Sequence, residues 1–277
     1  MASVIRAIAR SAPSSLRRGV ERLLDPYVRR VARSIPIDQV RTNDVFIVGY
    51  PKSGTTWLQH LVAGLVFRVN LDFTPDLLVQ DLVPDVHARR YYRRYLSRTF
   101  FKSHHRPQAN YRRVVYLVRD GRDAIVSYHH YLNQLAGRRY NLARLVEHGE
   151  GLEHGPWHQH VEAWMANPFG AEMLVVRYED LRADPRREVE RLCRFVDLDC
   201  PPEVVDDVAS KCSFEQMQAR ERAYGIEEWD SSQGLFVRRG KVGGFRDEMP
   251  AQALEAFNAQ SAVALRRFGY LESKYTS

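Results

Sequence analysis

The stretch Val45-Phe-Ile-Val-Gly49-Tyr-Pro-Lys52-Ser-Gly54-Thr-Thr-Trp57 decides how this chain folds. Four apolar residues lead into Gly49, and a short loop closes at Gly54. Beyond the loop, apolar residues recur at helical spacing, namely Trp57, Leu58, Leu61, Val62, Leu65 and Val66. The segment therefore predicts a buried strand, a glycine-bounded loop and an amphipathic helix.

A loop of this kind directs backbone N–H groups and the N-terminus of a helix at one point, which makes an anion site. Lys52 adds a full positive charge, and Thr55 and Thr56 add hydroxyl donors. The sequence therefore predicts that a phosphate-bearing ligand binds here.

The spacing of Gly49 and Gly54 is that of the Walker loop G-x-x-x-x-G-K-[ST], but Thr55 stands where the lysine should follow. The lysine lies inside the loop instead, at Lys52. The string YPKSGTTW resembles the 5′-phosphosulfate loop of the cytosolic sulfotransferases, which use 3′-phosphoadenosine 5′-phosphosulfate (PAPS) and release the bisphosphate PAP. The resemblance implies a set of loop residues that bind the cofactor: Lys52, Ser53, Gly54, Thr55, Thr56 and Trp57.

A second cluster follows the apolar run Val114–Val118. Arg119 sits at the carboxyl end of this predicted strand, where ligands of open α/β sheets bind, and Ser127 lies about two helical turns further on. A guanidinium fork suits a terminal phosphate. The cluster resembles the family's 3′-phosphate motif, which implies that Arg119 and Ser127 bind the 3′-phosphate of PAPS.

A third cluster, residues 236–246, resembles the family's R-K-G-x-x-G-D-W-K segment and implies further 3′-phosphate ligands at Arg238, Arg239 and Gly240. The match is degraded, because Arg239 replaces the lysine and Gly-Phe-Arg replaces Asp-Trp-Lys at 244–246. The dimerisation motif that continues this segment in many family members is not legible, since Pro250 and Ala251 occupy its centre. The oligomeric state stays open.

For the chemistry, Lys102-Ser103-His104-His105 resembles the family's K-[ST]-H segment, whose histidine is the catalytic base. The alignment implies His104, with the adjacent His105 as the competing candidate. Histidine suits proton abstraction near neutral pH. Lys52 and Lys102 supply positive charge for the departing phosphate oxygen. This scheme of in-line transfer requires no metal.

Two weaker resemblances concern the adenine. Tyr178-Glu-Asp180 is similar to the family's strand-end Y-E-D, whose tyrosine contacts the base. Cys212-Ser-Phe214 with Met217 is similar to a T-S-F-x-x-M adenine pocket, with Cys212 in place of threonine. Residues Trp157, Val161 and Trp164 have helical spacing and are assigned to the core.

Apolar runs at 99–102, 114–118 and 173–176 alternate with helical patterns, including a helix capped by Asp184 with Pro185 at its first position. We therefore predict an α/β fold, a single domain with a central parallel sheet flanked by helices around a P-loop-like strand-loop-helix. The sulfotransferase domain is predicted to span residues 36–277.

Residues 1–35 form a basic amphipathic segment that we read as helical, with three alternatives: packing on the domain, peripheral contact with an anionic membrane, or an organellar transit peptide. The 277 residues carry a formal charge of +7, contain no apolar run of membrane-spanning length, and include three cysteines without a CxxC pair. Together these features favour a cytoplasmic protein.

The function predicted is transfer of the sulfuryl group of PAPS to a hydroxyl or amine of a small-molecule, glycan or lipid acceptor, with no nucleic acid partner. One alternative is a P-loop kinase of small molecules, which should keep the Walker lysine. Another is a basic RNA- or membrane-surface-binding module that uses the N-terminus and the Tyr91–Tyr95 segment, YYRRY. The second alternative leaves the spaced phosphate motifs unexplained. The acceptor walls are expected within 71–96, 128–150 and 220–236.

Overall fold

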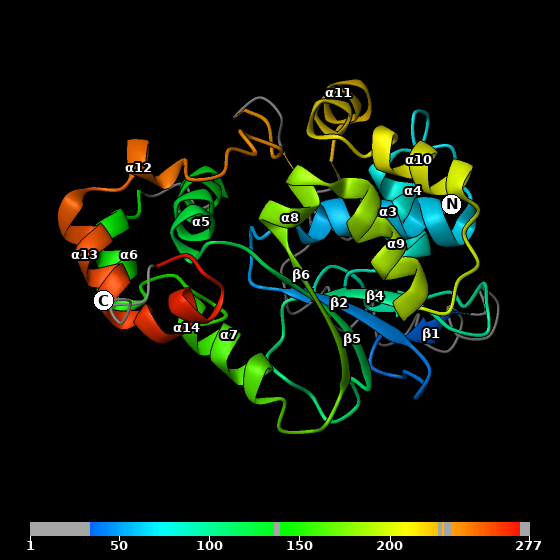
Figure 1. The fold of residues 1–277 in the computed structure, drawn as a ribbon, viewed down its shortest axis with the longest axis horizontal. Helices are drawn as coiled ribbons and strands as arrows, with labels where there is room; N and C mark the ends of the chain where they lie inside the picture. The colour runs from blue at the N-terminus through cyan, green and yellow to red at the C-terminus, as the bar shows by residue number, and fades with distance from the viewer. Residues whose placement is uncertain (1–33, 136–138, 227–228, 230–233, 272–277) are drawn as a thin grey trace, which may run out of the picture.

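The structure, a computed structural model, describes residues 34–135, 139–226, 229 and 234–271. Its centre is a parallel sheet with the strand order β4-β2-β5-β6 (Figure 1). The strands are β2 (Val45–Gly49), β4 (Phe100–Ser103), β5 (Arg113–Val118) and β6 (Glu172–Arg177). Each lies within one to two residues of a predicted run, so the predicted α/β fold with a central parallel sheet is confirmed.

Both faces of this sheet are buried, and alternate residues of each strand feed two separate cores. On β2, Val45 and Ile47 pack into one core, while Phe46 and Val48 pack into the other. This explains why the central strands read as continuous apolar runs, as is typical of parallel sheets covered on both sides.

Helices cover the two faces as separate groups (Figure 1). One group packs on the face of Val45 and comprises α3 (Thr55–Phe67), α4 (Asp76–Leu82), α8 (Tyr178–Ala183), α9 (Pro185–Phe195), α10 (Pro202–Lys211) and α11 (Phe214–Tyr224). The other packs on the face of Phe46 and comprises α5 (Gly121–Leu135), α6 (Leu142–His148), α7 (Trp157–Ala166), α12 (Phe245–Glu248), α13 (Ala251–Gln260) and α14 (Ala262–Arg267).

Two of these helices have the start or the buried face that the sequence predicted. The side chain of Asp184 caps α9 by accepting a hydrogen bond from the backbone N–H of Arg187, and Pro185 occupies the first turn. On α7, Trp157, Val161 and Trp164 are each about 1% exposed, which confirms their assignment to the core.

At the chain start, the predicted helical segment 1–35 lies almost entirely outside the described residues. Ile35 belongs to a short strand, β1 (Ile35–Pro36), which pairs antiparallel with β3 (Tyr91–Tyr92). The YYRRY segment is therefore partly a strand, with Tyr92 buried and Tyr95 exposed. In the described part of the chain, no helix has both the length and the apolar character needed to cross a membrane.

The carboxyl ends of all four sheet strands lie at one edge, and the loops that leave them converge there. Close packing at this edge explains Gly49, because a Cβ atom at that position would lie 2.7 Å from the carbonyl oxygen of Leu117 and 2.9 Å from Thr55 Cγ2. Ligands of open α/β sheets bind at such an edge. The fold thus positions a site where the sequence motifs meet.

Candidate active site

The loop after β2 turns tightly between Gly49 and the first turn of α3. Lys52 and Gly54 both have positive φ angles, of 66° and 100°, and a Cβ atom on Gly54 would lie 2.9 Å from the ring of Tyr178. No side chain caps the N-terminus of α3. The first N–H groups of that helix therefore point out of the loop without helical acceptors, as an anion site requires.

A pocket of about 400 Å³ runs along this edge of the sheet. It collects nearly every residue that the motifs nominated: Lys52, Gly54, Thr55, Thr56, Trp57, Lys102, His104, Arg119, Ser127, Tyr178, Phe214, Met217, Arg238, Arg239 and Gly240. Two of the residues assigned to cofactor binding do not line it. Ser53 and Cys212 are both fully buried, and Cys212 packs in the core at the end of α10.

The side chain of Lys52 lies against aromatic rings. Its Nζ is 3.3 Å from the ring centroid of Phe236 and 4.7 Å from that of Tyr131. Burial, reinforced by the nearby Lys102, lowers the pKa of Lys52 well below the ordinary value for lysine. A bound anion would favour the charged form and oppose this effect.

Arg119 is fixed at the end of β5 by contacts to two loops. Its Nη1 donates to the carbonyl oxygen of Lys52 and its Nη2 to that of Lys241, each over 3.2 Å. The guanidinium also lies over the ring of Tyr178, with Cζ 4.4 Å from the centroid. Its Nε is buried and has no hydrogen-bond partner among the described residues. The positive charge is thus held in place while the Nε donor stays unused.

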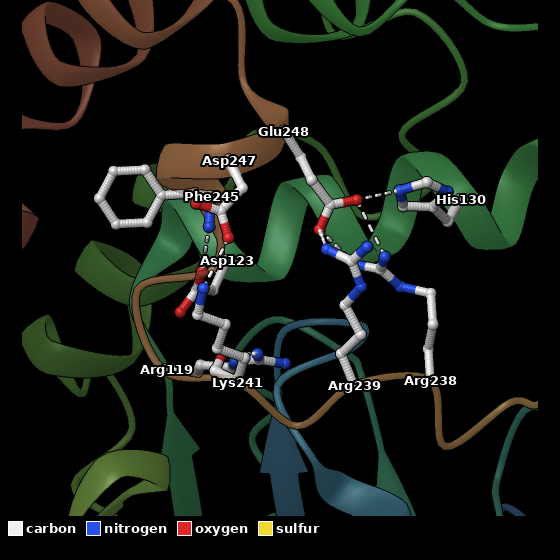
Figure 2. Close-up of polar contacts among 9 residues, drawn as sticks. All are labelled: Arg119, Asp123, His130, Arg238, Arg239, Lys241, Phe245, Asp247 and Glu248. Atoms are coloured by element: carbon white, nitrogen blue, oxygen red, sulfur yellow. Dashed lines mark hydrogen bonds and ion pairs between the residues drawn. The ribbon is translucent and has the colours of Figure 1, made fainter.

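Two further arginines come from the segment before α12 and share one carboxylate (Figure 2). Arg238 donates from Nη1 and Nη2 to the two oxygens of Glu248, over 2.9 and 3.0 Å. Arg239 Nη1 lies 3.0 Å from Glu248 Oε1, and His130 Nε2 lies 2.7 Å from Oε2. Glu248 also lines the pocket, and sequence reasoning missed it.

Asp123 on α5 anchors this segment from below (Figure 2). Its carboxylate accepts hydrogen bonds from the backbone N–H groups of Gly243 and Phe245, over 2.7 and 2.8 Å. Burial raises the pKa of Asp123, although Arg119 and the two N–H groups favour its charged form. Next to it, Lys241 Nζ and Asp247 Oδ2 form an exposed ion pair of 2.6 Å.

The two adjacent histidines differ in position. His104 lines the pocket, and its Nδ1 lies 2.7 Å from the carbonyl oxygen of Gly49. His105 does not line it, and its Nδ1 contacts the hydroxyl of Tyr111 over 3.1 Å. Burial, with Lys102 nearby, lowers the pKa of His104 well below its ordinary value, so the ring is neutral near pH 7.

Lys102 forms a buried ion pair that the sequence did not reveal. Its Nζ lies 2.9 Å from Asp85 Oδ2, with the two side chains 9% and 10% exposed, and it donates to Thr56 Oγ1 over 3.3 Å. Asp85 reaches this place because the segment around Val86 hydrogen-bonds to the edge of β4, where it accepts from and donates to the backbone of Lys102. His87 on the same segment accepts a hydrogen bond at Nε2 from the backbone of His104.

The three regions expected to form the acceptor walls all contribute to the pocket. Region 71–96 supplies Gln80, Asp85, His87 and Ala88, region 128–150 supplies Tyr128 and Tyr131, and region 220–236 supplies Ile226, Trp229 and Phe236. Glu153 and His154 add to the wall from a loop that sequence reasoning assigned to no site. Many of these side chains carry hydrogen-bonding groups.

Comparison with known proteins identifies this architecture. The sulfotransferase domain family matches residues 42–269, most of the chain. The chain belongs to the sulfotransferase family. Mouse sulfotransferase 1E1 is 25% identical over 265 residues, which cover 87% of this chain and 89% of that protein. The amine sulfotransferase of Oryctolagus cuniculus is 25% identical over 240 residues, covering 79% and 80%.

Solved structures agree on the fold. Retinol dehydratase in complex with androsterone and the inactive cofactor PAP superposes with a TM-score of 0.64 at 20% identity, covering 86% of this chain and 84% of that one. Mouse sulfotransferase SULT7A1 complexed with PAP gives 0.59 at 19% identity, covering 83% and 89%. This sulfotransferase is thus a PAPS-dependent enzyme, as the sequence predicted. The family match favours this function over the two alternatives, a small-molecule kinase and an RNA- or membrane-surface-binding module.

The pocket residues fit a cofactor that carries several phosphate groups. Backbone N–H groups of α3 and three arginines face one space, and Arg119 Nε is a buried donor without an acceptor among the described residues. Gly240 has a φ of 58°, and a Cβ atom there would lie 2.3 Å from the ring of Phe214. Only glycine therefore allows this backbone to run so close to the pocket wall.

Proposed function

We propose that this sulfotransferase transfers the sulfuryl group of PAPS to a hydroxyl or amine of its acceptor, with His104 as the base. The observation that carries the proposal is the 2.7 Å contact between His104 Nδ1 and the Gly49 carbonyl oxygen. Because a carbonyl only accepts, Nδ1 carries the proton and Nε2 keeps its lone pair. A neutral ring in this tautomer, within the pocket, is competent to take a proton from an acceptor.

Lys52 and Lys102 are proposed to stabilise the charge that builds on the departing phosphate oxygen. Both line the pocket, and Lys102 Nζ donates to the Thr56 hydroxyl in the first turn of α3. Bound PAPS would supply the sulfuryl group, and PAP would leave through its 5′-phosphate oxygen. Lys52 would then exchange its contact with the Phe236 ring for an anionic oxygen. The nearby negative charge would raise the pKa of Lys52 and favour its protonated form.

The cofactor contacts are proposed to divide into three groups. Lys52, Ser53 through its backbone, Gly54, Thr55, Thr56 and Trp57 would hold the 5′-phosphosulfate. Arg119, Ser127, Arg238, Arg239 and Gly240 would hold the 3′-phosphate. Tyr178, Phe214 and Met217 would contact the adenine, while Cys212 would act only through packing, because it is fully buried outside the pocket.

For the acceptor, we propose a small molecule. A glycan or a lipid head group stays a further candidate. Solved relatives hold retinol or androsterone, and one similar protein is named an amine sulfotransferase. The walls here include His87, His154 and Gln80, which favour an acceptor with polar groups. We retain as proposals a cytoplasmic location, the absence of a nucleic acid partner and peripheral membrane contact through residues 1–35.

Calorimetry and a transfer assay test this function. PAP should bind much more tightly than adenosine 5′-monophosphate (AMP) or ATP, because one charge-assisted contact to the 3′-phosphate contributes about 1.5–3 kcal/mol. Labelled PAPS offered with phenols, sterols, amines, glycans and glycolipids should give a labelled product with at least one class. Equal affinity for PAP and AMP would refute the assignment of the 3′-phosphate site.

A further inference from the structure

Glu248 occupies an unexpected place in a site built for anions. The carboxylate lines the pocket and binds both Arg238 and Arg239, the two side chains to which the proposed function assigns part of the 3′-phosphate site (Figure 2). We propose that Glu248 holds these arginines while no cofactor is bound and competes with the 3′-phosphate for them. The inference rests on the proposed function and adds a residue that sets cofactor affinity.

Both oxygens of Glu248 are engaged by the arginines. Arg238 uses both terminal nitrogens on the carboxylate, and Arg239 adds a contact to Oε1. The exposed fractions of the side chains are 16% for Glu248, 28% for Arg238 and 52% for Arg239. The Arg238 pair is therefore the better shielded of the two, and it uses the fork of donors that would otherwise grip a phosphate in bidentate fashion.

Glu248 is an anion under ordinary conditions. Burial raises the pKa of its carboxyl, but Arg238 and His130 outweigh burial and hold the pKa below the ordinary value for glutamate. A phosphate monoester carries a larger charge and more acceptor oxygens than a carboxylate, so it can take over the arginines. When the phosphate replaces Glu248, however, the hydrogen bonds between Glu248 and the two arginines are lost, and this loss reduces the net binding free energy.

Arg119 shows the contrast within the same pocket. Its terminal nitrogens bind two backbone carbonyls, and no ion pair to a carboxylate is present for it among the described residues. Arg119 can therefore meet a phosphate without releasing an anion. The cost of releasing Glu248 therefore falls only on the contacts of Arg238 and Arg239. These contacts are made to the 3′-phosphate, which AMP lacks.

This arrangement should weaken PAPS and PAP equally, because both carry the 3′-phosphate. Uniform weakening raises KM without lowering the chemical rate. Where product release limits turnover, a weaker grip on PAP also shortens its residence time. Glu248 thus trades cofactor affinity against release of the product.

The test is Glu248→Gln, which removes the charge and keeps the shape. By calorimetry, the variant should bind PAP roughly tenfold more tightly than the wild type, the equivalent of one charge-assisted contact no longer given up. Its affinity for AMP should stay within about twofold, because AMP has no 3′-phosphate to compete for. Thermal unfolding without ligand checks that the variant is folded.

Asp247→Asn is the matched control. It removes the same charge from the neighbouring residue of the same short helix, but its partner is Lys241, in a pair that is more than half exposed. It should change PAP affinity by less than about twofold, since exposed pairs are screened. An equal gain in both variants would show that only the net charge matters and would overturn the role of Glu248.

Two other results also overturn the inference. Weaker PAP binding by Glu248→Gln would mean that the carboxylate orients the arginines toward the phosphate instead of competing with it. Unchanged PAP binding would mean that the arginines do not exchange partners. Failure of the proposed function is separate, because it would already appear in the wild type as equal affinity for PAP and AMP.

Discussion

Replacing Asp85 by Asn should destabilise the protein, because Lys102 would lose its only carboxylate partner among the described residues. The two charged atoms are 2.9 Å apart, and about 90% of each side chain is buried. Breaking a buried pair by removing one partner costs about 3–5 kcal/mol, since the remaining charge is left uncompensated.

The pKa of Asp85 gives a second figure for the same ion pair. Burial alone would raise it, but Lys102, assisted by His104, lowers it from 3.8 to about 2. At 1.36 kcal/mol per pKa unit, this corresponds to about 2 kcal/mol. The two arguments place the loss in free energy of unfolding for Asp85→Asn at about 2–5 kcal/mol at pH 7.

The sign of the pH dependence follows from the direction of this pKa. Because the folded-state pKa lies below the unfolded one, the contribution is present above about pH 4 and fades as the pH falls toward 2. Urea unfolding of both proteins at pH 7 and pH 3 should therefore show a smaller difference at pH 3. A loss below 1 kcal/mol at pH 7, or an equal loss at both pH values, would refute the reasoning; the exposed-pair variant Asp247→Asn serves as control.

Three further predictions concern the proposed catalytic roles. His104→Ala should abolish sulfuryl transfer with PAP affinity close to that of the wild type, whereas His105→Ala, outside the pocket, should be much milder; the opposite order would shift the base by one residue. Lys52→Met should lower kcat by roughly 10²–10³-fold, while Arg119→Met should mainly weaken PAP binding by roughly 10–100-fold; equal losses of kcat and affinity in both variants would contradict separate roles. Gly54→Ala should lower the free energy of unfolding by about 1–3 kcal/mol, because its φ is 100° and the new Cβ meets Tyr178; chemical denaturation that finds no change would count against a strained loop.

Local sequence patterns were enough to predict the sheet and its edge. The apolar runs that became β2 and β5 are bounded by Gly49 and by Arg119, so both strand ends and the ligand edge follow from the chain itself. The resemblance to a family predicted that motifs far apart in the sequence bind one cofactor. The structure does bring Arg119 and Arg238 into one pocket.

Residues that depend on long-range packing were not predictable in this way. Asp85 reaches Lys102 only because its segment bridges to the edge of β4, a pairing without a local signature. Glu248 had a weak signal, because it lies two residues after the degraded motif that contains Arg238 and Arg239, but its third partner, His130, lies on α5. Cys212 shows the converse: the motif position matches, yet the thiol is packed in the core.

The carboxylate of Asp123 has a consequence for any attempt to divide or recombine this chain. It binds the backbone of Gly243 and Phe245, 120 and 122 positions further along, and it is largely buried. A fragment that ended before residue 234 would keep Asp123 but lose both donors, and its buried carboxylate would be left without these two hydrogen bonds. A chimera that took the last forty residues from a relative would need a backbone that returns to the same two hydrogen bonds. The segment that carries Arg119 and the segment that carries Arg238 must therefore stay in one chain, or be matched to each other, for the anion site to form.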